Sequence, residues 1–313
     1  MRLMPDRARL ALLGGLTVAA VLVPSAASAH TKGVTLNGDW APFNRCPVDA
    51  PAMLSADGVT NTADCVASSS PSGTIKIGNL TVAGGQSSLQ FGLINNTSTG
   101  FSIVAPQSGA IASAPAQIPG GLAALLCPSS NPHIATLCRH LAHSKLNNVK
   151  ATIESAGSPS NFSLLGGLSA GTPIVTLPVK LVLSNPLLGR NCSIGTNSDP
   201  IVLHPENAAA PTVQAENFDG NGTPDSSGVM LAIFSTGQTQ TDTTFSVPGA
   251  TGCGPFGLGD AIINQKVGLP SASGNSLTLT NASAYLGGLA TPAAAAPNDG
   301  KDLSSYWHSA VTG

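Results

Sequence analysis

The sequence has little charge and few aromatic side chains. Asp, Glu, Lys and Arg make up 9% of the 313 residues, whereas about a quarter is typical of globular proteins, and Phe, Trp and Tyr make up only 4%. The 13 basic residues are scattered singly and the formal net charge is −2, so we expect no nucleic-acid partner. The scarcity of aromatic rings also argues against a glycosidase, which needs two carboxyls across a cleft and normally rings that stack on sugars.

Other patterns are missing as well. The chain contains no phosphate loop and no dinucleotide-binding fingerprint. No apolar run of membrane-spanning length follows residue 29, so we expect no transmembrane segment beyond that point. Disorder is not expected either, because Val, Ile and Leu recur in short runs and the mean hydropathy is positive.

The first 29 residues have the organisation of a secretory signal peptide. Three arginines lie near the N-terminus, an apolar run covers residues 10–23, and Ala27-Ser28-Ala29 fits the rule for signal-peptidase cleavage. We therefore expect residues 1–29 to be removed before His30, which makes residues 30–313 a secreted, extracellular protein. Such a protein folds in an oxidising environment, where disulfide bonds form and persist.

The six cysteines predict a disulfide framework rather than a metal site. An even number of cysteines in an exported chain indicates three disulfides, for which fifteen pairings exist. Metal-binding cysteines usually occur as closely spaced pairs, and this chain has none. We expect sequential pairing, because each bond then encloses one coherent segment: Cys46–Cys65, Cys127–Cys138 and Cys192–Cys253.

Short runs of β-branched and aliphatic residues, separated by Gly, Pro, Asn and Ser, dominate the rest of the chain. This texture is typical of strands joined by turns. Residues 74–82 alternate between apolar and polar side chains, which indicates one strand with a solvent-facing side, followed by a turn at Gly84-Gly85. The expected strands cover residues 33–38, 59–67, 73–83, 87–94, 101–105, 149–155, 173–184, 200–204, 229–235, 243–247 and 277–279.

Two segments favour helices. Apolar residues recur at three- and four-residue spacing over 132–146, and 254–267 contains a run without turn signals. The predicted fold class is therefore mainly β: an antiparallel β-sandwich or linked β subdomains with one or two short helices. The β-rich region covers 30–313, with an alternative division into 30–115 and 148–313 around a helical segment at 116–147.

One loop has the oxygen spacing of a calcium site. Asp219, Asn221, Thr223 and Asp225 place side-chain oxygens at alternate positions, as the first ligands of calcium loops do. The mid-loop glycine and the late bidentate acid of an EF-hand are missing. A tight turn rich in Asp, Asn and Gly accounts for the same residues, so both interpretations stay open. Calcium is the one cofactor that the sequence suggests.

No catalytic constellation emerges from the sequence. Residues 167–171 match the G-x-S-x-G pattern around Ser169, but that pattern needs a strand before the serine and a helix after it, and an expected strand follows here. His140 and His143 share one face of the expected helix, which also carries His133, and no acidic residue lies nearby in the sequence to complete a metal site. We assign no catalytic residue and favour a non-enzymatic protein.

Three stretches carry a family resemblance. They are Leu36-Asn37-Gly38-Asp39-Trp40-Ala41-Pro42-Phe43 with the residues that follow to Gly58, Ile194-Gly195-Thr196-Asn197-Ser198-Asp199-Pro200-Ile201, and Tyr306-Trp307-His308-Ser309-Ala310. In these stretches the chain resembles a family of exported, disulfide-containing actinobacterial proteins of unknown function. The resemblance covers most of residues 30–313 and implies a secreted, disulfide-linked actinobacterial protein, with no catalytic residue to carry over. We expect Trp40 and Trp307 to be core anchors.

Three functions are compatible with these features. The first is a non-enzymatic exported protein of the cell surface or extracellular space, in contact with the cell envelope, because low charge suits adhesion or assembly. The second is a module that binds an apolar or envelope-derived ligand between its sheets, which a large apolar cavity would favour. The third and least favoured is a secreted serine hydrolase that uses Ser169.

Overall fold

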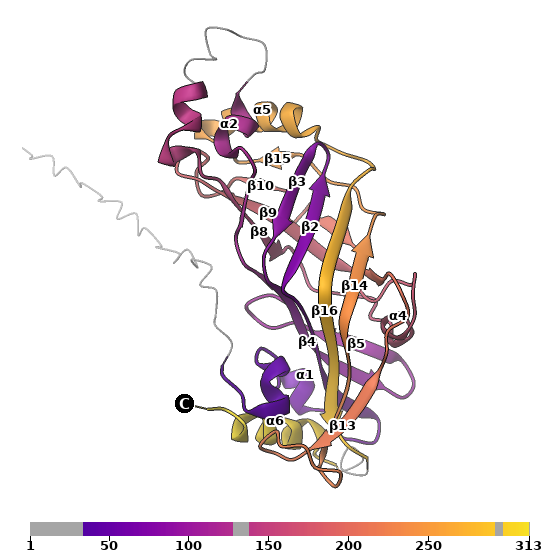
Figure 1. Cartoon of the computed structure of the whole chain (residues 1–313). Coiled ribbons are helices and arrows are strands. Elements are labelled where there is room, and N and C mark those ends of the chain that lie inside the picture. The colour runs from indigo at the N-terminus through magenta and orange to yellow at the C-terminus, as the bar shows by residue number, and fades with distance from the viewer. Residues whose placement is uncertain (1–33, 128–137, 292–296, 313) are drawn as a thin grey trace, which may run out of the picture. The chain divides into compact units, whose positions relative to one another are not determined.

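Antiparallel strands form most of the structure, a computed structural model that describes residues 34–127, 138–291 and 297–312 (Figure 1). The predicted fold class, mainly β with short helices, is confirmed. The described residues form two sheets. The larger sheet contains β1 (Asn61–Ser70), β2 (Ser72–Ile77), β3 (Leu80–Gly84), β4 (Ser87–Asn96), β5 (Gly100–Val104), β6 (Ile111–Ser113), β12 (Glu206–Asn207), β13 (Gln214–Phe218), β14 (Met230–Asp242) and β16 (Ser276–Leu289).

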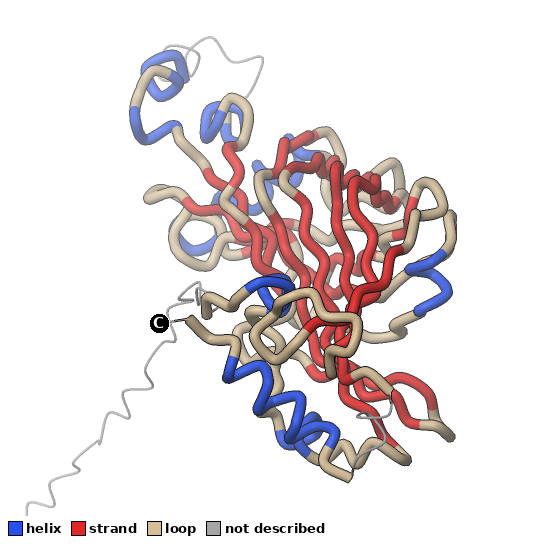
Figure 2. The backbone as a smooth tube through the Cα atoms, turned by 60° about the horizontal axis from the view of Figure 1, so that its bottom comes forward, coloured by secondary structure: helices blue, strands red, loops and turns tan. Residues whose placement is uncertain are grey.

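The centre of the larger sheet joins strands from distant parts of the chain. Its main path runs β12-β14-β16-β1-β4-β5, and β13, β2 with β3, and β6 extend it by pairing with β14, β16 and β4. β16 pairs with β1 from Asp64↔Gly288 to Ser69↔Ser283, so the C-terminal part of the chain lies beside the N-terminal part. The strands run side by side through the middle of the view in Figure 2.

The smaller sheet is shorter and also antiparallel. Its path runs β15-β10-β9-β8-β7, with β11 beside β9. The most apolar expected strand became β9, whose residues alternate between buried and half-buried, as in a strand with one face on the core. The strands of this sheet are β7 (Ala116–Gln117), β8 (Lys150–Ser155), β9 (Leu177–Ser184), β10 (Ser193–Ile194), β11 (Ile201–Leu203) and β15 (Ala250–Thr251).

The helices lie at the ends and on one side of the larger sheet. Figure 1 shows α2 and α5 at one end and α1 and α6 at the other. The helical segments are η1 (Gly38–Phe43), α1 (Pro51–Leu54), α2 (Gly121–Leu126), η2 (Lys145–Asn147), α4 (Leu164–Leu168), η3 (Pro255–Gly257), α5 (Leu258–Val267) and α6 (Asp299–Ser309).

The two faces of the larger sheet belong to two hydrophobic clusters. Side chains alternate between the faces of a strand, so Ala63, Cys65 and Ala67 of β1 point away from Val66. The first face packs with η1, α1 and α6 around Trp40, Phe43 and Trp307. The second packs against the smaller sheet through residues such as Phe91, Val179, Leu181 and Leu277. We call these the helix-covered face and the groove face.

Helix α6 was not expected from the sequence. Its first turn carries Asp299 and Asp302 and its last turn carries His308, which suits the helix dipole. Leu303 and Trp307, four residues apart, are buried on one side of the helix. Trp40 is buried in the same cluster, so the expectation that both tryptophans are core anchors is confirmed.

Three of the expected strands are wrong in detail. Residues 73–83 form two strands rather than one, because Gly78 has a left-handed backbone (φ 54°) and turns β2 into β3. In the segment expected at 33–38, the described residues 34–37 contribute a bridge from Leu36 to Val311, and η1 begins at Gly38. In the segment 243–247, only Val247 forms a bridge, to Ser271. The helix expected at 254–267 is present as α5.

The three expected disulfides are confirmed with their pairing. Cys46–Cys65, Cys127–Cys138 and Cys192–Cys253 are bonded, and no cysteine is free. Three disulfides fit a protein of an oxidising, extracellular environment. Residues 132–137 of the helix expected at 132–146 lie outside the described residues; the described part begins at Cys138 with a short helical stretch, and η2 follows at Lys145.

Candidate functional site

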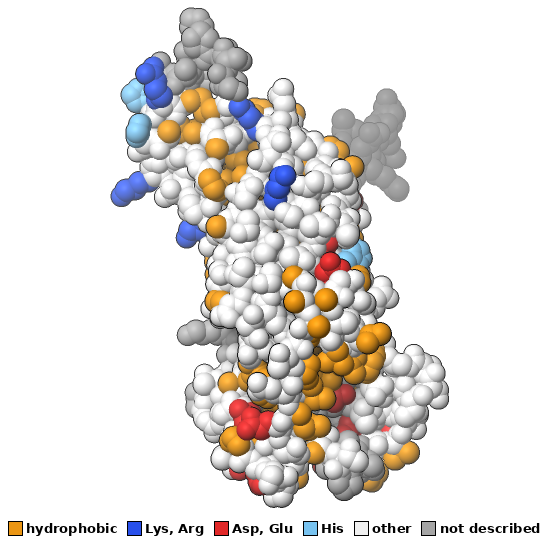
Figure 3. Space-filling model, turned by 45° about the vertical axis from the view of Figure 1, so that its right-hand side comes forward, with side chains coloured by type: hydrophobic (Ala, Val, Ile, Leu, Met, Phe, Trp, Pro, Cys, Tyr) orange, Lys and Arg blue, Asp and Glu red, His pale blue; other side chains and the backbone are white. Residues whose placement is uncertain are grey.

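An apolar groove lies on the groove face of the larger sheet. Its volume is about 90 Å³, and none of the described residues that line it is charged. Exposed apolar side chains border it, among them Leu168 (42% exposed) and Val213 (41%). Hydrophobic side chains gather in the lower half of the view in Figure 3. An exposed apolar surface of this kind marks a binding site more often than a folding requirement.

Rows of register partners from four strands build the floor of the groove. One row is Phe91 on β4, Val66 on β1, Leu286 on β16 and Ile233 on β14. The next row is Leu89, Ser68, Ala284 and Ser235 on the same strands. Because partners in an antiparallel pair point to the same side, both rows present their side chains to the groove.

Helix α4 and the segments around it form the opposite wall. Phe162 contacts Phe91 across the groove, with ring centroids 5.8 Å apart and planes at 73°. The hydroxyl of Ser163 accepts a hydrogen bond from the backbone N–H of Gly166 at 2.9 Å and caps the helix. Gly166 lies against the backbone of Pro173, where a Cβ would be 2.3 Å from the carbonyl oxygen, so α4 needs a glycine there.

Asn207 holds α4 against the sheet. This side chain is 1% exposed, and its Nδ2 donates hydrogen bonds to the carbonyl oxygens of Gly167 at 3.0 Å and Ser169 at 3.3 Å. Gln240 in turn donates to Asn207 Oδ1 at 3.5 Å. This network satisfies carbonyl groups at the C-terminal end of a very short helix, which has few stabilising contacts of its own.

The groove continues between the two sheets. A second pocket of about 80 Å³ shares Ser68, Leu89, Pro205 and Gln240 with the first, and Leu177, Leu203 and Leu277 extend its apolar lining. A third, of about 40 Å³, adjoins the second at Leu277 and Leu279. No charged residue lines either of them among the described residues. The three pockets therefore adjoin one another along the space between the sheets.

Two carboxyls lie where β16 leaves β1. Asp299 is 1% exposed, and its Oδ2 accepts a hydrogen bond at 2.7 Å from the backbone N–H of Ala63, one residue beyond the end of the β1–β16 ladder. Burial raises the pKa of Asp299 to about 6. Burial and the charge of Asp299 raise the pKa of Asp64 to about 7. Both carboxyls therefore hold protons more tightly than ordinary aspartates do.

Among the described residues, no His or acidic side chain forms a hydrogen bond with Ser169. Its hydroxyl donates to the carbonyl oxygen of Leu165 at 2.8 Å. It follows helix α4 instead of preceding a helix, so the strand–serine–helix order of a nucleophile elbow is absent here.

The loop with the calcium spacing is a set of Asx turns. Asp219 Oδ1 accepts hydrogen bonds from the backbone N–H groups of Asn221 and Thr223 at 2.8 and 2.9 Å. Asp225 Oδ1 accepts from the backbone N–H and the hydroxyl of Ser227. The described residues contain no group of three or more His, Cys, Asp or Glu side chains arranged to hold a metal ion. Calcium at this loop stays a prediction.

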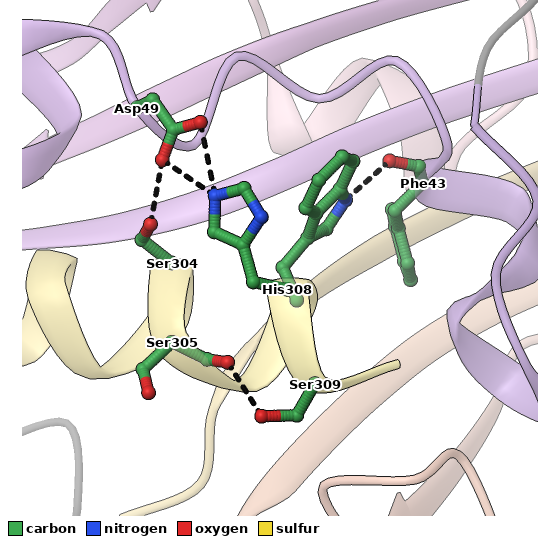
Figure 4. Close-up of polar contacts among 7 residues, drawn as sticks. Phe43, Asp49, Ser304, Ser305, His308 and Ser309 are labelled. Carbon is green, nitrogen blue, oxygen red and sulfur yellow. Dashed lines mark hydrogen bonds and ion pairs between the residues drawn. The ribbon is translucent and has the colours of Figure 1, made fainter. Parts of the chain in front are cut away.

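A cluster of Asp49, Ser304 and His308 joins α6 to the segment before α1 (Figure 4). The Ser304 hydroxyl donates to Asp49 Oδ1 at 2.7 Å, and His308 Nε2 lies 2.9 Å from the same oxygen. The carboxylate therefore stands between the other two side chains, whereas a catalytic triad needs the imidazole next to the hydroxyl. This cluster could not be predicted from the sequence, because Asp49 lies more than 250 positions from Ser304 and His308. The contacts of Asp49 with Ser304 and His308 hold α6 against the segment before α1.

Two of the three histidines of the helix expected at 132–146 are described, and both are exposed: His140 and His143. The third, His133, lies outside the described residues. No helix of the described residues is long and apolar enough to cross a membrane.

Comparison of the chain with protein-family models, with curated proteins and with solved structures gave no match.

Proposed function

We propose that the protein is exported and binds an elongated apolar molecule in the groove between its sheets. The pattern of residues 1–29 and the three disulfides support an extracellular location. The observation that carries the binding function is the set of adjoining apolar pockets, because packed cores rarely leave such space between sheets.

The dimensions and chemistry of the groove suit an apolar chain. A dry cavity of about 150 Å³ lined by aliphatic and aromatic side chains is enough to bind benzene in another protein. The first two pockets here measure about 90 and 80 Å³, adjoin each other and have apolar linings. The polar side chains among the described lining residues are all uncharged; they belong to Asn207, Gln240, Tyr285 and several serines, such as Ser68 and Ser235.

Displacement of a neutral fluorescent probe tests the proposal. N-phenyl-1-naphthylamine should fluoresce in the groove of the folded protein, and an added long-chain alcohol such as dodecanol should displace it. Ala284→Trp places a ring in the row of Leu89, Ser68 and Ser235 and should abolish the signal. Ala83→Trp is the matched control, because Ala83 is exposed on β3 and does not line the groove. Equal signals from the two variants would contradict binding in the groove.

A second candidate, adhesion or assembly at the cell surface, has one observation in its favour. A surface with few charges is weakly repulsive, which allows close approach to an envelope or to another copy. Fractionation of a culture tests it: attachment predicts that the protein sediments with cell walls, and a protein found wholly in the medium would count against it.

A further inference from the structure

An acidic side chain, Asp64, lies on the groove face next to the apolar floor and outside the residues that line the groove itself. Asp64 lies two residues before Val66 on β1, so both point to the same face, and the two positions are about 7 Å apart along the strand. Its register partners are Leu93 on β4 and Gly288 on β16. The row that contains Asp64 therefore follows directly after the row of Phe91, Val66, Leu286 and Ile233.

The carboxyl of Asp64 has no hydrogen-bond donor among the side chains and backbone groups of the described residues. It lies over Gly288, where any Cβ would collide with Asp64 Oδ1, so the absence of a side chain at 288 makes room for it. A half-buried carboxyl without a donor reduces stability. Carboxyls whose pKa values are strongly raised by burial and like charge cluster at functional sites.

The surroundings of this carboxyl favour a cation. The charges that act on Asp64 and Asp299 come from other carboxylates, namely Asp299 itself, Asp302 and Asp57. Arg45 is directed elsewhere, because its guanidinium donates to the carbonyl oxygens of Gly109 and Ala110. On the face drawn in Figure 3, Lys and Arg side chains of the described residues appear in the upper half of the view, and acidic side chains appear near the hydrophobic ones in the lower half.

We propose that the ligand of the groove is an amphiphile with a protonated amine, whose ammonium group binds Asp64 and whose apolar chain lies along Val66, Phe91 and Leu286. This inference rests on the proposed function, because it assigns a head group to the molecule that the groove holds. An ammonium donates the hydrogen bonds that the carboxyl lacks, and charge-assisted hydrogen bonds are stronger than neutral ones. A carboxylate head would instead meet like charge.

Three ligands of equal chain length test the head group. Dodecylamine, dodecanol and dodecanoate compete with N-phenyl-1-naphthylamine at pH 8 below their micellar concentrations. Dodecylamine should bind about tenfold more tightly than dodecanol, as expected for one charge-assisted contact, and dodecanoate should bind most weakly. Asp64→Asn should bring dodecylamine to the affinity of dodecanol and leave dodecanol unchanged.

A matched control removes the same charge elsewhere. Asp199→Asn changes an exposed residue between β10 and β11, outside the groove, and should keep the preference for the amine. Dodecanoate binding as tightly as dodecylamine, or a preference that Asp64→Asn leaves intact, would overturn the head-group assignment while the groove function stands. Failure of all three compounds to displace the probe would overturn the groove function itself.

Discussion

The two faces of the larger sheet are built from alternate residues of the same strands, yet they are packed very differently. On the helix-covered face, Gly287 allows the ring of Phe43 to approach so closely that a Cβ would lie 2.5 Å from it, and Gly92 does the same for Met53. On the groove face, Gly288 lies beneath an unpaired carboxyl and the neighbouring rows border open space. The helix-covered face is thus closely covered, whereas the groove face leaves space beside the elements that pack on it.

Loss of an anchor on the helix-covered face should have the largest effect. Trp307 is 7% exposed, and its Nε1 donates to the carbonyl oxygen of Phe43 at 2.9 Å. Trp307→Ala should lower the free energy of unfolding by about 4 kcal/mol, because it leaves a large cavity and an unpaired carbonyl. Urea denaturation measures this. Phe162→Ala, on the groove side, should lower the free energy of unfolding much less. Equal losses in the two variants would contradict the difference in packing between the two faces.

The disulfide on the helix-covered face should come next. Cys46–Cys65 joins the segment after η1 to β1 and closes a loop with a sequence separation of 19. Its removal in the double variant Cys46→Ser, Cys65→Ser should cost about 3 kcal/mol in the chain-entropy model. Thermal unfolding of the variant and of the oxidised parent gives the value. An unchanged melting temperature would show that this face does not depend on the cross-link.

Asp64 should behave in the opposite way, since it reduces stability. Its pKa is about 7 and that of Asp299 about 6, whereas both are near 4 in the unfolded chain, so the folded state binds more protons between about pH 4 and pH 7. The free energy of unfolding therefore falls as the pH rises through that range. Asp64→Asn should flatten the fall and be about 2 kcal/mol more stable than the parent at pH 8.

Denaturation curves at pH 5 and pH 8 provide the check on Asp64. Asp199→Asn serves again as the control for loss of one charge, and its stability should follow the parent at both values. A variant Asp64→Asn that is less stable than the parent at pH 8 would mean that the carboxylate is paired in the folded protein.

Loosening the wall of the groove should have the smallest effect on stability. Asn207→Ala removes the hydrogen bonds to the carbonyl oxygens of Gly167 and Ser169 and should cost about 1 to 2 kcal/mol. Because α4 is held by few other contacts, hydrogen exchange at Gly166 and Gly167 should become faster while that of β1 stays slow. Unchanged exchange in α4 would show that Asn207 does not hold it.

Much of the framework could be predicted from the sequence. Export chemistry and the even number of cysteines indicate the disulfides, and their order along the chain indicates the pairing. Trp40 and Trp307 stand out as anchors because large aromatic residues are so rare here. Residues 73–83 mislead, because an alternating pattern continues through Gly78, and only the positive φ of that residue reveals the turn.

The groove could not be predicted, because it depends on pairing between distant segments. Its floor combines Val66, Phe91, Ile233 and Leu286 from four strands, and nothing local indicates that β16 returns to lie beside β1. One feature of the sequence does mark Asp64 as unusual. Aspartate is depleted in strands, and this one interrupts a segment that otherwise reads as a strand.

Native mass spectrometry of the protein mixed with dodecylamine shows whether the groove face holds the ligand. We expect a one-to-one complex for the parent and for Ala83→Trp, and its loss in Ala284→Trp, whose new ring occupies the groove. A complex that persists in Ala284→Trp, or none in the parent, would contradict the assignment of the groove face as the binding surface.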